Sequence, residues 1–450
     1  MALLRLAGFR AVRVTSFWEP GLSEPTPHEA MVLSNVGTAA ALQAVRVYVS
    51  VYHAGSRTTP LTAAARSQFA SYAAAIVKAS PAIRDVIVGN EPNLNRFWMP
   101  QFTPRGTGAS APAYLRLLAA TYDELKAVAP EVKVWGGALG PRGVDRPDTG
   151  RDTISPTRFL RELGAAYRAS GRDHPVMDGF SFHPYPPNSS VAVDAVPSDP
   201  DHLGLVDQDR LVQLLGRAFD GTAQVGSGMP ILYDEFGIES AIPSDKRALY
   251  SGFEPLTTRP VPEAIQAAAY RRAMLLAYCQ SNVAGMLLFH TRDEPGRPGW
   301  QSGVVYADGT PKSSLDPVRT AIDDAAAGRI GLCPIPSKAT VSFASSTRTI
   351  SLRCERACSY RARLTRHRLA APAALRIGRA PAGKRIRLTV AGPATPGWYQ
   401  LSVSFVHPTR PGRPLVRVST PFVVRRSSPP RSSPGAAALR TLSPRSWLGQ

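Results

Sequence analysis

The sequence predicts an α/β fold, a (β/α)8 barrel of the TIM type, followed by an all-β sandwich domain. Two observations predict this architecture. Up to about residue 325, short apolar runs alternate with longer alanine- and leucine-rich stretches, the rhythm of βα units. From Cys333 onward, short β-like segments follow one another, with Gly or Pro in several connections. We therefore expect a barrel over 1–325, a β-sandwich of immunoglobulin type over 333–425, and a disordered basic tail over 426–450.

The barrel is predicted from apolar runs that have the length of strands. They are Ala11–Thr15, Val45–Tyr52, Val86–Asn90, Val132–Gly136, Gly179–His183, Ile231–Glu235 and Gly285–Phe289. Several end in polar or aromatic residues, as a parallel barrel with its site on the carboxyl face requires. A closed barrel has eight strands, and Leu3–Phe9 reads as the end of a helix. We expect strand 1 to be missing from this chain, and the natural protein to begin upstream of Met1 with an export signal and that strand.

The sandwich is predicted from short segments of β character in the basic C-terminal region. They are Ala339–Ala344, Thr349–Arg353, Ser359–Leu364, Ala374–Ile377, Arg385–Val390, Trp398–Phe405 and Leu415–Val424. So many short strands in so few residues are typical of a β-sandwich.

The net charge of +20 is concentrated at the C-terminal end. From Ala326 onward there are 22 Lys and Arg residues and one acid, Glu355, so this part carries +21 and the remainder −1. Such a module favours anionic polymers in general, and we expect a cell-wall polymer as partner rather than a specific nucleic acid. No apolar run reaches the roughly 18–20 residues that a membrane helix needs.

The cysteines indicate the compartment. Cys279 falls in a helical stretch and is predicted to be a buried free thiol. Cys333, Cys354 and Cys358 lie in the basic region, where a disulfide between two of them is expected in an exported β domain. The alternative, half of a zinc site, is disfavoured because no second metal-binding pair follows. A secreted or cell-wall-associated protein is therefore expected.

Two glutamates each stand at the carboxyl end of a predicted buried strand. Glu91 lies in Val86-Ile-Val-Gly-Asn-Glu-Pro-Asn93, and Glu235 lies in Ile231-Leu-Tyr-Asp-Glu-Phe-Gly237. Parallel strands bring their carboxyl ends to one face of a barrel, so the two carboxyls are expected to meet there. Cleavage of a glycosidic bond requires such a pair, one protonated and one ionised.

At these residues the chain resembles glycoside hydrolase clan A, the group that contains many cellulases, β-mannanases and β-xylosidases. The resemblance implies that Glu91 is the acid/base and Glu235 the nucleophile of a retaining double displacement on an oligo- or polysaccharide, without a cofactor. It also implies that Asn90 binds the sugar 2-hydroxyl.

Further residues match the clan on other strands. Arg13 resembles the arginine that hydrogen-bonds the nucleophile, and His183 with Tyr185 resembles the His-x-Tyr of the sixth strand. An arginine between two valines is costly unless it meets a carboxylate, and Glu235 is its natural partner. Such a contact would keep Glu235 ionised, while a more apolar pocket would keep Glu91 protonated.

The aromatic platform for the sugar departs from the clan pattern. Where many members carry a tryptophan, this chain has Phe289 and His290, so one of them lies there or Trp300 reaches in from the loop. Trp98 is a second candidate for stacking on sugar. Asp234 is expected to face the helices and to be structural.

Two alternatives stay open at this point. His53, His183 and His290 end three strands and would suit a metal-dependent barrel hydrolase. The barrel would alternatively be a non-catalytic module that binds carbohydrate or cell wall.

Overall fold

A computed structural model describes residues 1–280 and 282–329, together with strand residues further along the chain. These are 339–344, 349–354, 358–366, 372–380, 385–389, 397–407 and 410–424. The chain divides into two compact units, Met1–Cys333 and Pro334–Gln450. Among the described residues, no helix is long and apolar enough to cross a membrane.

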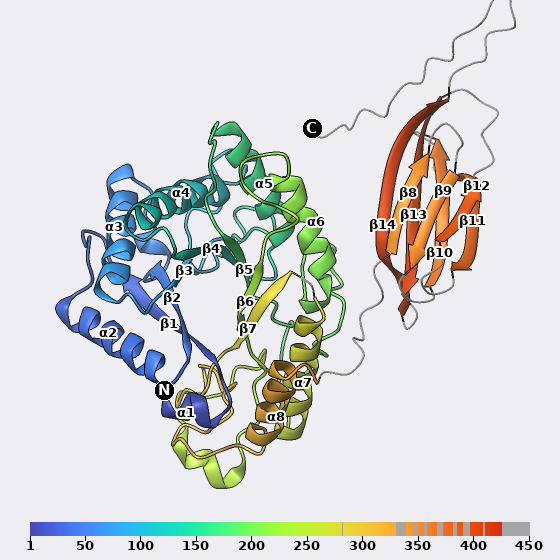
Figure 1. Ribbon diagram of the computed structural model, residues 1–450. Coiled ribbons are helices and arrows are strands. Elements are labelled where there is room, and N and C mark those ends of the chain that lie inside the picture. Colours follow the sequence, from blue (N-terminus) through green and yellow to red (C-terminus); the bar gives the residue numbers. More distant parts are fainter. Residues whose placement is uncertain are drawn as a thin grey trace, which may run out of the picture. The chain divides into compact units, whose positions relative to one another are not determined.

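The first unit is built on a seven-stranded parallel sheet in the order β1-β2-β3-β4-β5-β6-β7. Its strands are β1 (Ala11–Trp18), β2 (Arg46–His53), β3 (Asp85–Val88), β4 (Lys133–Leu139), β5 (Gly179–Phe182), β6 (Ile231–Phe236) and β7 (Val283–Leu288). Each predicted strand is present. The sheet curls into a barrel with helices around its outside (Figure 1). In this sheet β1 and β7 are not paired with each other, and a short helix, α1 (Ala2–Leu6), precedes β1. The described residues therefore form the barrel of seven strands that the sequence predicts.

Helices follow most of the strands, as the alternating pattern requires. They are α2 (Pro27–Leu42), α3 (Ala63–Ala79), α4 (Ser110–Val128), α5 (Pro156–Ala169), α6 (Gln208–Phe219), α7 (Glu263–Tyr278) and α8 (Leu315–Ala326), with 3-10 turns at Ser56–Thr58, Leu205–Asp207 and Ser244–Leu249. Thr26, Thr62 and Ser155 cap α2, α3 and α5 by accepting a hydrogen bond from a backbone N–H of the first turn. Such caps satisfy donors that a helix start leaves free.

Apolar side chains pack inside the barrel, and a charged group lies at the amino end of β3. Tyr48, Ile87, Trp135, Ala138 and Leu232 form a buried group inside the strands. At the start of β3, the Asp85 carboxylate accepts hydrogen bonds from the Arg46 guanidinium at 2.6 and 2.7 Å and from the Trp135 indole at 2.9 Å. The amino ends of the strands are thereby tied together, which leaves the carboxyl ends for the site.

The second unit contains two antiparallel sheets, with the strand orders β11-β10-β13-β14 and β12-β9-β8. The strands are β8 (Ala339–Ala344), β9 (Thr349–Cys354), β10 (Cys358–Arg366), β11 (Pro372–Ala380), β12 (Arg385–Thr389), β13 (Gly397–His407) and β14 (Arg410–Val424). All the short strands predicted for this region are therefore present. Leu352, Ala362, Leu364 and Val403 are buried on these strands.

One cysteine prediction is wrong. Cys279, at the end of α7, is not a free thiol but takes part in a disulfide bond. A helical position next to apolar neighbours predicts burial, but it carries no information on a partner that is distant in the sequence. The side chains of Cys333, Cys354 and Cys358, and the tail over 426–450, lie outside the described part of the structure.

Candidate active site

A large cavity opens at the carboxyl ends of the strands and continues along the unpaired edges of β1 and β7 to α8. Its volume is about 1700 Å³, and its walls include Arg13, Asn90, Glu91, Tyr185 and Glu235. Arg13 lies on β1, Asn90 and Glu91 follow β3, Tyr185 follows β5 and Glu235 lies near the end of β6, so the barrel brings these residues predicted from sequence to one place.

The first carboxylate is held by the turn after β3. Gly89 and Glu91 there adopt positive φ angles of 84° and 40°. A Cβ on Gly89 would lie 2.9 Å from the ring of Tyr114, so this position requires glycine. The Tyr114 hydroxyl donates to the Val88 carbonyl and accepts from the Gly137 N–H, both at 2.7 Å. Buried Tyr114 thus joins the ends of β3 and β4 and fixes the backbone that carries Glu91.

Two adjacent carboxylates end β6. Glu235 lines the cavity, and Asp234 is 2% exposed with its Oδ2 3.2 Å from Nε2 of His183. The prediction that Asp234 faces the helices is wrong. Strict alternation fails here because the register between β6 and β7 shifts between Tyr233 and Phe236. Asp234 therefore acts on the site by holding His183.

Arg13 on β1 contacts the second carboxylate, as predicted. Its Nη1 donates a short hydrogen bond to Oε1 of Glu235, and Oδ2 of Asp234 lies 3.5 Å from the same nitrogen. Nη2 donates to Ser50 Oγ at 3.0 Å and to Asn90 Oδ1 at 2.9 Å. Burial disfavours the guanidinium, but the charges of Glu235 and Asp234 outweigh burial and raise the pKa of Arg13.

His183 lies between the two glutamates and is fully buried. Its Nδ1 is 3.0 Å from Oε1 of Glu91 and 3.5 Å from Oε2 of Glu235. The sum of these distances, 6.5 Å, is therefore the upper limit for the separation of the two carboxylate oxygens. Burial opposes protonation of His183, but the negative charges of Glu235 and Asp234 prevail and raise its pKa to about 10. A positively charged ring thus holds the carboxylates together.

Aromatic side chains form the wall beside Glu235. The Tyr185 hydroxyl donates to Oε2 of Glu235 at 3.1 Å, and burial together with the nearby negative charges raises the pKa of Tyr185. Trp300 lies against Tyr185 with ring centroids 5.2 Å apart and packs edge-on against Phe289 at 5.3 Å. Of the alternatives that the sequence left open, Trp300 does reach in from the loop after β7.

Other candidates lie elsewhere. Trp98, predicted to bind sugar, is 1% exposed and packs between His53 and Tyr114 instead of lining the cavity. His53 Nδ1 is 2.7 Å from the Gly55 carbonyl, whereas His290 lines the cavity beside Phe289. Among the described residues no group of three or more metal-binding side chains exists, so the three histidines do not form the site that the metal alternative needs.

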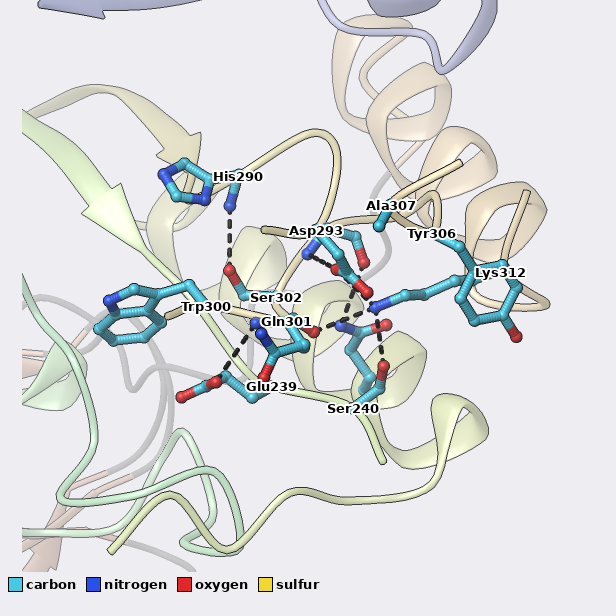
Figure 2. Close-up of polar contacts among 12 residues, drawn as sticks. Glu239, Ser240, His290, Asp293, Trp300, Gln301, Ser302, Tyr306, Ala307 and Lys312 are labelled. Carbon is cyan, nitrogen blue, oxygen red and sulfur yellow. Dashed lines mark hydrogen bonds and ion pairs between the residues drawn. The ribbon is translucent and has the colours of Figure 1, made fainter. Parts of the chain in front are cut away.

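The structure adds a carboxylate that sequence reasoning missed. Glu239 lies four residues after Glu235, lines the cavity and is 7% exposed. Its Oε2 accepts a hydrogen bond of 3.3 Å from the backbone N–H of Gln301, next to Trp300 (Figure 2). Burial raises the pKa of Glu239 to about 7. No motif marked this residue, because its surroundings come from a loop some sixty positions away.

A buried lysine holds these two loops together. Lys312 Nζ lies 2.8 Å from both Ser240 Oγ and Asp293 Oδ1, and 3.0 Å from the Gln301 carbonyl (Figure 2). The other Asp293 oxygen accepts from the Tyr250 hydroxyl at 2.7 Å. All three lysine protons therefore have acceptors, and the loops that carry Glu239 and Trp300 are fixed relative to each other.

Replacing Glu239 with glutamine is expected to make the protein more stable at pH 8. The wild-type carboxyl keeps its proton up to about pH 7 in the folded state but loses it near its ordinary pKa when unfolded. Stability is therefore lost as pH rises from about 4.5 to 7. Glutamine removes that loss, so Tm should exceed the wild-type value by roughly 2–5 °C at pH 8 and equal it at pH 4.

Thermal unfolding followed by circular dichroism at both pH values measures this difference. Glu131→Gln, at an exposed position ahead of β4, is the control and should change Tm little at either pH. The positive charge of Lys312 opposes the effect of burial on Glu239. A Glu239→Gln variant that is less stable than the wild type at pH 8 would show that this charge stabilises the ionised carboxylate more than burial destabilises it.

Glu91 and Glu235 thus lie together at the carboxyl ends of a curled parallel sheet. No family model and no curated protein matches this chain. Among solved structures, it is similar to a family 39 glycoside hydrolase from Bacteroides cellulosilyticus WH2, with a TM-score of 0.50 and 16% identity over 86% of this chain and 77% of that one. A monomeric β-xylosidase from Caulobacter crescentus CB15 has a TM-score of 0.46 and 13% identity over 86% and 89%. The chain thus shares the barrel fold of this family 39 glycoside hydrolase, which agrees with the fold that the sequence resemblance predicted.

Proposed function

We propose that this protein is a retaining glycoside hydrolase that cleaves a β-linked glycoside. The observation that carries the proposal is the placement of Glu91 and Glu235 around one histidine nitrogen, with their nearest oxygens at most 6.5 Å apart. Retaining enzymes keep their carboxyl groups about 5–5.5 Å apart, and inverting enzymes about 6.5–9.5 Å apart. The limit of 6.5 Å for this pair of oxygens includes the retaining range and excludes all but the lower edge of the inverting range, so it favours the retaining mechanism.

The first step would form a covalent intermediate. An oxygen of Glu235 attacks the anomeric carbon while the bond to the leaving oxygen breaks, and Glu91 gives that oxygen its proton. Arg13 and Tyr185 each donate to a different oxygen of Glu235, so the nucleophile is held in one orientation. Asn90 uses its carbonyl oxygen for Arg13, which leaves its amide N–H groups to donate to a sugar hydroxyl.

The second step reverses the roles. Glu91, now ionised, takes a proton from water, the hydroxide oxygen bonds to the anomeric carbon, and the ester to Glu235 breaks. His183 contacts both carboxylates and stays protonated well above neutral pH, so it offsets their charge through both steps.

A trapping experiment tests this proposal. Aryl β-glycosides of several sugars identify an accepted glycone, and its 2-deoxy-2-fluoro derivative with a good leaving group should then accumulate as a glycosyl ester on Glu235. Mass spectrometry of the peptide with Glu235 locates the adduct, and NMR of the first product gives its anomeric configuration. A first product of inverted configuration, or an adduct on another residue, contradicts the mechanism.

We also propose that the protein acts outside the cell, held to anionic wall polymer by its C-terminal part. The disulfide at Cys279 supports an oxidising compartment. The +21 charge from Ala326 onward supports the polymer.

Binding of the full chain to an anionic wall polysaccharide is expected to weaken steeply with salt. Release of counterions makes the logarithm of the association constant fall linearly with that of the salt concentration, so about tenfold or more should be lost between 50 and 200 mM NaCl. Fluorescence anisotropy with a labelled polymer measures this, and a neutral polysaccharide is the control. Binding that salt does not change would contradict the electrostatic role.

A further inference from the structure

An arginine with one unpartnered nitrogen lines the cavity near Glu91. Arg142 follows β4, and its Nη1 is enclosed by protein with no hydrogen-bond partner among the described residues. A guanidinium nitrogen that is buried without an acceptor is costly, so such a group normally pairs with an anion. The rest of the side chain is partly exposed and lines the cavity, so a ligand there can pair with the guanidinium.

The loop that carries Arg142 is fixed by its neighbours. The Asn93 side-chain amide donates to the Gly140 carbonyl at 3.1 Å and to the Arg142 carbonyl at 3.4 Å. The backbone N–H of Leu203 donates to the Pro141 carbonyl at 3.0 Å. Because both sides of the loop are tied to other elements, the guanidinium is presented to the cavity from a held backbone.

Arg142 lies nearer to Glu91, the proposed general acid, than to the paired nucleophile Glu235. Burial lowers the pKa of Arg142, and the negative charge of Glu91 opposes that shift. Glu235, in contrast, is paired with Arg13. The general acid has to face the oxygen of the leaving group, so the sugar unit next to Arg142 is the one that leaves.

We propose that Arg142 binds a carboxylate on the leaving-group sugar, so that the substrate is a polysaccharide containing uronic acid units. The planar guanidinium presents a fork of N–H donors that matches the two oxygens of a carboxylate. Arg96 and Arg146 line the same cavity. This inference rests on the proposed glycosidase activity and names the class of substrate.

A matched pair of substrates tests the inference. Carbodiimide activation followed by borohydride reduces each uronic carboxylate of a polysaccharide to a primary alcohol and leaves the linkages intact. The full-length wild type should release reducing ends from the acidic polymer about 10–100-fold faster than from its reduced form, measured as kcat/KM, as expected for a charged hydrogen bond. Arg142→Met and Arg142→Gln should bring this ratio to within about threefold of one, and Arg142→Lys should keep an intermediate ratio.

Two controls separate this contact from general attraction. Arg151→Met removes an exposed cation of the same loop that does not line the cavity, and it should keep the wild-type ratio. Assays at 0.3 M NaCl screen exposed charges, including those of the C-terminal part, more than a buried contact.

The outcomes distinguish the inference from the proposed function. If the wild type cleaves acidic and reduced polymers equally, Arg142 does not bind a carboxylate. The same holds if Arg142→Met keeps the wild-type ratio of kcat/KM on the two polymers. In both cases the proposed glycosidase activity is unaffected. A preference confined to sulfated polymers, lost on desulfation, also overturns the carboxylate assignment. If no polysaccharide and no aryl glycoside is cleaved, the proposed function itself fails.

Discussion

Replacing Glu235 with glutamine should lower kcat/KM by about 10⁴-fold or more on every glycoside tested. An amide nitrogen or neutral carbonyl oxygen is a poor nucleophile, so the glycosyl ester cannot form. The loss should not depend on the leaving group, because a better leaving group does not replace the missing nucleophile. Arg13 keeps Asp234, Ser50 and Asn90 as partners in this variant, so the site is expected to stay folded.

Initial rates on aryl glycosides and on polysaccharide measure the effect. Glu131→Gln, an exposed carboxyl ahead of β4 and far from the carboxyl ends of the strands, is the control and should match the wild type. In Glu235→Gly, added azide can enter the space left by the side chain, and the glycosyl azide formed should have inverted configuration. Activity of Glu235→Gln within tenfold of the wild type would remove Glu235 from the mechanism.

The barrel could be predicted from sequence because its strands are buried on both faces. Val45–Tyr52 and the other runs are largely apolar with single polar residues between, and such a run between helices has few other interpretations. Because parallel strands have their carboxyl ends on one face of the barrel, the polar ends of these runs were expected there, with Glu91 near Glu235. The His-x-Tyr resemblance pointed to His183 and Tyr185, which follow β5 and both contact Glu235.

The predictions for Asp234 and Trp98 are wrong because the local sequence pattern does not reveal which residues surround a side chain in the folded protein. Asp234 was assigned to the outer face by alternation, but an irregularity in β6 turns it inward, and no residue type announces that irregularity. Trp98 follows β3 like a sugar-binding aromatic, yet His53 and Tyr114 enclose it.

Glu239 and Arg142 were missed for a related reason. Each lies in a loop, and its importance comes from burial beside the cavity rather than from any spacing in the sequence. Glu239 meets Gln301 only because Lys312 joins two loops across the barrel rim. A buried charge of this kind is visible only after the chain has folded.

Replacing Glu91 with glutamine should have an effect that depends on the leaving group. Glycosides with poor leaving groups should lose about 10²–10⁴-fold in kcat/KM, because general acid catalysis is worth roughly that much. Activated aryl glycosides need little protonation, so their first step should slow by less than about tenfold. The second step lacks its general base, so the glycosyl ester on Glu235 should accumulate and give a burst of released phenol.

Stopped-flow assays over a series of aryl glycosides measure this dependence as the slope of log kcat/KM against the pKa of the leaving phenol. The slope should be steep and negative for Glu91→Gln and shallow for the wild type. Added azide should restore turnover of the activated substrates with retained configuration, since azide needs no base to attack the ester. His183→Asn is a useful comparison, because the histidine holds both carboxylates and its loss should slow all substrates by a similar factor. If Glu91→Gln loses the same factor on good and poor leaving groups, Glu91 is not the acid/base, and the shared contact with His183 serves only to position Glu235.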